Sequence, residues 1–181
     1  MSDFQTQLSS WGEELSSYHI PRWDELPDMQ LYMDQVVTYI EKHLGVLSLN
    51  SEQKIITAAM INNYVKLSLM PKPEKKRYDR VHLAYLIAIT ILKQVLTISD
   101  IKDGILLQSK INGYRAAYDL FCQEQEVALA IVAAKAKNEP VPIPADYPKN
   151  QLAMHMATTA VSSKLLAEKI LQIKSPELLE Q

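Results

Sequence analysis

The chain has few of the residues on which several common protein classes depend. Among its 181 residues are one cysteine, four glycines and two phenylalanines. A single cysteine, Cys122, excludes an internal disulfide and suits a reducing compartment. Four glycines are too few for a glycine-rich phosphate-binding loop. The shortage of glycine, together with abundant leucine, isoleucine, alanine and lysine, favours an all-α protein.

Long apolar runs and targeting signals are also missing. The longest nearly apolar run, residues 83–92, has ten residues, whereas a membrane-spanning helix needs roughly 20. The N-terminal sequence MSDFQTQLSSW lacks the basic and apolar regions of a secretory signal. We therefore expect a cytoplasmic protein that has no membrane partner.

Signals for catalysis and for metal binding are absent as well. The four histidines are scattered, and the chain contains no HExxH motif and no paired cysteines. His155 lies between two methionines, but alternate positions on a helix do not converge on one metal ion. Cys122 lies on an apolar helical face with Tyr118 and Phe121, which favours an inert core thiol over a nucleophile. We expect no enzymatic activity, no cofactor and no metal.

Apolar residues recur at helical spacing through most of the chain. The predicted helices cover residues 3–16, 29–44, 57–68, 80–96, 98–107, 111–137 and 150–173. Their predicted N-caps include Ser2, Asp28, Thr57, Asp79 and Thr97. The helix after Asp79 is apolar nearly all round, which is typical of a buried central element. The segment 17–27 is expected to be a connector and 140–148 a stiff, proline-rich linker.

Basic residues are concentrated in one part of an acidic chain. Residues 54–80 contain seven basic and two acidic side chains, although the whole chain has a net charge of −2. Residues 1–53 contain nine acidic side chains and only two basic ones. Such a concentrated basic patch is typical of a site for phosphate groups.

The basic patch coincides with a helix, a basic loop and a second helix, the layout of a winged helix-turn-helix. In the helix 57–68, periodicity places Ile61 and Leu69 inward, and Asn62, Asn63 and Lys66 outward. Asparagine is suited to bidentate recognition of adenine in the major groove. The loop 72–77 carries the side chains expected to hold the phosphate backbone: Lys72, Lys75, Lys76 and Arg77.

Three blocks of the sequence carry a resemblance. The segment YHIPRWDELPD and the later blocks MINNYVK and PKPEKKRY resemble the bacterial family known as domain of unknown function 1836, over roughly residues 18–110. The core is in turn similar to the DNA-binding head of MerR-type regulators: Leu69-Met70-Pro71 matches the end of the recognition helix, Arg77-Tyr78 the end of the wing, and 79–83 and 96–101 the next two helices. The resemblance places Asn62, Asn63 and Tyr64 at positions that contact DNA.

Three departures from the MerR pattern concern base reading. Ser68 replaces a usual glycine, the wing is short, and Ala58 and Ala59 stand where an arginine often reads bases. Tyr64 suits either the core or a phosphate contact, whereas Tyr78 is expected to pack under the loop.

These patterns predict a DNA-binding transcriptional regulator with three regions: an N-terminal helix and connector (1–27), a winged helix-turn-helix core (28–108) and a helical region for dimerisation or a small-molecule effector (109–181). The expected partners are double-stranded DNA and a second copy of the chain. The predicted DNA-binding residues are Asn62, Asn63, Tyr64, Lys66, Lys72, Lys75, Lys76, Arg77 and Arg80. The alternative is a protein-interaction module that retains the fold without specific DNA binding. The aromatic face of Tyr114, Tyr118 and Phe121 is expected to pack against the last helix or a second subunit rather than to line an effector pocket.

Overall fold

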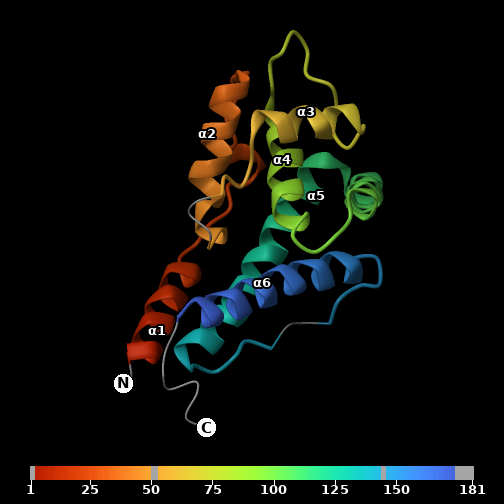
Figure 1. The fold of residues 1–181 in the computed structure, drawn as a ribbon. Helices are drawn as coiled ribbons and strands as arrows, with labels where there is room; N and C mark the ends of the chain where they lie inside the picture. The colour runs from red at the N-terminus through yellow and green to blue at the C-terminus, as the bar shows by residue number, and fades with distance from the viewer. Residues whose placement is uncertain (1–2, 50–52, 144–145, 174–181) are drawn as a thin grey trace. The chain divides into compact units, whose positions relative to one another are not determined.

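The computed structural model describes residues 3–49, 53–143 and 146–173. Its regular elements are all helical, which confirms the predicted all-α class (Figure 1). They are α1 (Asp3–Ser16), η1 (Trp23–Glu25), α2 (Met33–Leu44), η2 (Gly45–Leu47), α3 (Ala58–Lys66), α4 (Arg80–Leu92), α5 (Ile98–Lys137) and α6 (Leu152–Gln172). The predicted cap Ser2 lies outside the described residues.

The chain forms two compact units. One comprises residues 20–123, and the other comprises 1–19 with 124–181. These limits differ from the regions expected from the sequence, because α1 belongs to the same unit as α6 and the chain passes between the units within α5.

In the unit that joins both termini, α1 approaches the end of α5 closely. A Cβ atom added at Gly12 would lie 2.7 Å from Cγ of Lys137 and 3.0 Å from the carbonyl oxygen of Ala133. Glycine is therefore needed at this position for the two helices to approach each other.

Helix α4 forms the centre of the unit 20–123. Its side chains are buried nearly all round, as its apolar sequence predicts; the fully buried ones are Leu83, Leu86, Ile87, Ile89 and Ile91. Helix α2 packs against both α4 and α3. Helix α4 ends at Leu92, four residues before the predicted limit. Residues 93–97 form a turn and a short loop that lead to α5.

The predicted N-caps Thr57 and Asp79 are confirmed, whereas the predicted N-cap Asp28 is wrong. The Thr57 hydroxyl accepts a hydrogen bond from the Met60 amide at 3.2 Å, and the Asp79 carboxylate accepts one from the His82 amide at 3.2 Å. Asp28 does not cap α2, which begins at Met33 behind Tyr32. The chain is held extended before α2 because Leu31 and Tyr78 exchange two backbone hydrogen bonds, of 2.8 and 2.9 Å.

The two predicted helices 98–107 and 111–137 are both present within α5, where they meet at a kink at Gly113, later than the predicted gap at 108–110. This glycine has φ 75° and ψ 162°, a backbone conformation that residues with a Cβ rarely adopt. The predicted capping interaction at its start is present, since the Asp100 amide donates to the Thr97 hydroxyl at 3.2 Å.

The connector after residue 20 is anchored on α5. The Tyr118 hydroxyl donates a hydrogen bond of 2.6 Å to the Pro21 carbonyl, and the Trp23 amide donates one of 2.7 Å to the Asp119 carboxylate. The Trp23 ring packs edge-on against Tyr118 with centroids 6.4 Å apart. The Tyr118 and Phe121 side chains thus belong to the core, with Tyr118 on the connector rather than on the last helix, whereas Tyr114 is exposed.

The buried phenol of Tyr118 should make the folded protein less stable at alkaline pH. Burial raises the pKa of its phenol above the ordinary value of 10. Above pH 10 the unfolded chain releases this proton while the folded chain retains it, so the free energy of unfolding should fall as pH rises. In Tyr118→Phe, urea unfolding should show a smaller alkaline loss and a cost of about 1 kcal/mol at pH 7 from the missing hydrogen bond. Tyr32→Phe, which removes an exposed phenol, is the control and should keep the full alkaline loss.

The end of α3 gives a second prediction. Ser68 has φ 54°, and the amides of Ser68 and Leu69 donate to the carbonyls of Val65 and Tyr64 at 3.1 and 2.9 Å, which is a Schellman motif. Holding a residue with a Cβ in the left-handed region costs roughly 1–2 kcal/mol. Glycine avoids this cost, but it loses more conformational entropy on folding, which offsets part of the gain. Ser68→Gly should therefore raise the free energy of unfolding by about 0.5 to 1 kcal/mol. Ser68→Ala keeps the Cβ, and an equal gain in that variant would contradict the explanation.

Candidate nucleic-acid interface

The outer face of α3 is small, uncharged over its first two turns and open to solvent. Met60 is exposed at the edge of this face. The exposed positions of the face itself are Ala58, Ala59, Asn62, Asn63 and Lys66. They fall four residues apart along two adjacent rows, so they share one face of the helix. The opposite face carries Ile61 into the core, as the periodicity predicts, together with Tyr64.

The basic loop between α3 and α4 is a tight hairpin, here called the basic hairpin (72–77). Glu74 and Arg77 form an antiparallel bridge, and the Arg77 amide donates to the Glu74 carbonyl at 2.9 Å. Between them, Lys75 and Lys76 have φ values of 48° and 60°. Two central residues at positive φ are the feature of a type I′ turn, the turn that best matches the twist of paired strands. In Figure 1 this loop stands out beyond α3.

The base of the basic hairpin is fixed from both sides. Tyr78 pairs with Leu31 and is buried, with its ring edge-on to His82 at 5.5 Å. Tyr78 thus packs under the loop, as expected. The guanidinium of Arg77 lies 5.3 Å from the centroid of the Tyr32 ring and donates to its hydroxyl at 3.2 Å. The hairpin therefore displays its lysines from an anchored base.

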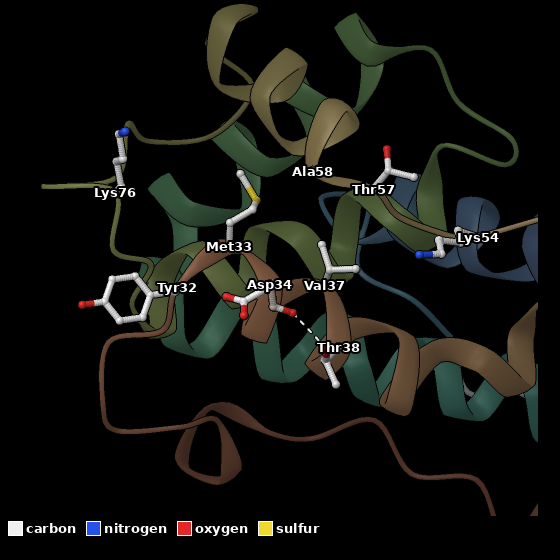
Figure 2. A pocket seen from close by; sticks show the side chains of 9 residues that line it. All are labelled: Tyr32, Met33, Asp34, Val37, Thr38, Lys54, Thr57, Ala58 and Lys76. Carbon is white, nitrogen blue, oxygen red and sulfur yellow. Dashed lines mark hydrogen bonds between the residues drawn. The ribbon is translucent and has the colours of Figure 1, made fainter.

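An open groove of about 640 Å³ brings together the starts of α2 and α3 and the tip of the basic hairpin (Figure 2). It is lined by Tyr32, Met33, Asp34, Val37, Thr38, Lys54, Thr57, Ala58 and Lys76. Met33 and Val37 contribute apolar side chains, while Lys54 and Lys76 contribute positive charge from separate segments. The first residue of α3 and the hairpin tip thus border the same hollow.

The lysines of this region are available to an external anion. Among the described residues, no ion pair engages Lys54, Lys66, Lys72, Lys75 or Lys76. By contrast, Lys137 and Lys164 of the other unit pair with glutamates.

Two predicted site residues have structural roles instead. Tyr64 is 5% exposed, and burial raises its pKa, so its ring belongs to the core. Arg80 donates to the Leu26 carbonyl at 3.1 Å and lies 3.5 Å from the Asp28 carboxylate, which ties the connector to α4. The other predicted residues are exposed: Asn62, Asn63, Lys66, Lys72, Lys75, Lys76 and Arg77.

Most of the residues that line the groove are absent from the predicted site, and Lys54 and Tyr32 are the most informative of them. Lys54 belongs to the basic patch, but it precedes α3 and its neighbours in the groove are distant in sequence. Tyr32 supports Arg77, and the only signal was an aromatic residue immediately before a helix.

Metal-ligating groups and membrane-spanning helices are the other features sought in the described part of the chain. No group of three or more metal-ligating side chains occurs among the described residues. Of the helices described, none combines the length and apolar character needed to cross a membrane. His155 lies 3.3 Å from the Glu124 carboxylate and stacks on Tyr147 at 3.7 Å, an arrangement that pins the linker to α6.

A family model, Domain of unknown function (DUF1836), matches residues 21–121, more than half of the chain. The chain belongs to this family. The DUF1836 match nearly coincides with the unit 20–123, which contains α2–α4 and the basic hairpin. No curated protein and no solved structure matches the chain.

The turn of the DUF1836 basic hairpin gives a prediction about stability. Asparagine and glycine tolerate positive φ better than lysine does. Lys75→Asn/Lys76→Gly should therefore keep the hairpin and raise the free energy of unfolding by about 1 kcal/mol, as measured by urea unfolding. The control is Lys72→Asn, which removes a positive charge of the basic hairpin at a position outside the turn and should leave stability unchanged. If this variant were stabilised as much as the double variant, relief of charge repulsion would explain the gain instead.

Proposed function

We propose that this DUF1836 protein is a DNA-binding transcriptional regulator. Helix α3, with the preceding cap at Thr57, enters the major groove, and the basic hairpin holds the phosphate backbone. The observation that carries the proposal is the rigid type I′ hairpin, whose free lysine at position 76 lines the same groove as the first residue of α3.

The order of elements supports a MerR-like winged helix-turn-helix for residues 28–108. Helix α2 packs on α3, the hairpin follows α3 as a wing, and α4 and α5 come next. The major groove of B-DNA admits an α-helix. The face formed by Ala58, Ala59, Asn62 and Asn63 has only short side chains, which favours its approach to the bases, and the exposed Met60 lies at the edge of this face.

The charges of the region set the expected salt dependence. The cations that lie outside the described ion pairs are Lys54, Lys66, Lys72, Lys75 and Lys76, and Arg77 lies beside them. Neutralising about five phosphates would make log K fall with log salt at a slope of about −4 to −5.

We also propose that the protein acts as a homodimer through residues 109–181, since a single reading head contacts few base pairs. In the unit 20–123, exposed apolar side chains surround the break in α5: Leu106, Leu107, Ile111 and Tyr114. In the other unit, Ile143, Leu152 and Met156 are exposed. These exposed residues also favour the second candidate function, a protein-interaction module that does not bind specific DNA.

Binding to fragmented genomic DNA at several salt concentrations tests the proposal. The wild-type chain should bind with the steep salt dependence given above and should enrich fragments upstream of genes. Lys75→Asn/Lys76→Gly keeps the turn but removes two positive charges, so its affinity should fall by about tenfold or more at low salt and its salt slope should shrink by about 2.

Lys102→Gln/Lys110→Gln is the matched control, because it removes two exposed lysines of the same unit from α5. It should bind DNA almost as the wild type does. If the wild type ignores DNA even at low salt, or if both variants lose the same affinity, the hairpin is not a DNA-binding wing and the interaction module becomes the better reading.

A further inference from the structure

The exposed face of α3 has an unusual chemistry for a recognition helix. Its first two turns present two methyl groups, on Ala58 and Ala59, and two carboxamides, on Asn62 and Asn63. It carries no arginine, aspartate or glutamate. These are the side chains that, with lysine, make the usual specific contacts to guanine and cytosine.

The two carboxamides are free to bind. Asn62 and Asn63 are exposed, and neither side chain forms a hydrogen bond with another described residue. A carboxamide offers an acceptor and a donor side by side, which match the N6 amino group and N7 of adenine in the major groove.

The two alanines add a second kind of contact. Ala58 precedes Asn62 by one turn, and Ala59 precedes Asn63 by one turn, so each methyl group lies beside one carboxamide. In the major groove, the C5 methyl group of thymine offers an apolar surface that alanine can contact. A short side chain also lets the backbone of α3 come close to the base edges.

The only charged side chain of this face is Lys66, on the last turn of α3. Lysine can contact guanine, but a flexible side chain at the end of the helix equally reaches the phosphate backbone. The two turns before it carry neither arginine nor lysine, the side chains that most often contact O6 and N7 of guanine.

We infer that α3 reads A·T base pairs, with Asn62 and Asn63 bonded to adenine edges and Ala58 and Ala59 packed on thymine methyl groups. This inference rests on the proposed function and adds the class of operator. The absence of arginine from α3 then reflects the bases that are read rather than a loss of base reading.

The test starts from selection of binding duplexes out of a pool with a randomised centre, using the full-length chain. The selected sites should be rich in A·T pairs. Two chemical changes to the selected duplex then isolate the contacts. Deoxyuridine in place of thymidine removes the C5 methyl group and should weaken binding about threefold, and 7-deazaadenine removes N7 and should weaken it about tenfold.

Asn62→Ala/Asn63→Ala provides the protein side of the test. Both positions are exposed and alanine favours helix, so the variant should fold. It should bind the selected duplex about tenfold more weakly, and it should no longer distinguish adenine from 7-deazaadenine. Its salt slope should equal that of the wild type because no charge changes.

The outcomes separate the two proposals. Selection of G·C-rich sites, or salt-dependent binding that is indifferent to both base changes, would overturn the A·T reading and leave the DNA-binding function intact. A variant that still responds fully to 7-deazaadenine would overturn the assignment to Asn62 and Asn63. Absence of DNA binding at every salt concentration would overturn both the inference and the proposed function.

Discussion

The burial of α4 on all sides is the constraint on which the rest of the unit 20–123 depends. Because Leu83, Ala88 and Ile89 are buried on three different sides of this helix, other elements must cover most of its circumference. Helix α2 covers part of α4 and packs in turn on α3. Because Asp79 caps α4, the end of the basic hairpin is tied to the most buried element of the unit.

The basic hairpin illustrates how a rigid framework supports an unfavourable local conformation. Two lysines at positive φ cost roughly 1–2 kcal/mol each, and such strain persists only where the surroundings determine the backbone. Here the surroundings are the Leu31–Tyr78 pairing below the turn and the Schellman motif at the end of α3. The result differs from a solvated loop, because charges on a fixed turn lose little entropy when they bind phosphates.

Local patterns predicted much of the architecture. The caps at Thr57 and Asp79, the inward side of α3 and the burial of α4 follow from spacing alone, since each depends on residues within a few positions of one another. The errors have a different origin. Asp28 has the chemistry of an N-cap, but the pairing of Leu31 with Tyr78 holds the chain extended and delays α2 until Met33.

The sequence by itself determined the helical class, the concentration of positive charge over 54–80 and the polarity of each face of α3, because these depend on composition and on short-range periodicity. Only the tertiary structure decided the partners that are distant in the chain. It grouped α1 with α6, buried the Tyr64 ring, joined Arg80 to the connector and left the lysine at 76 beside the start of α3. Such pairings depend on how several apolar faces are covered at once, which no local pattern records.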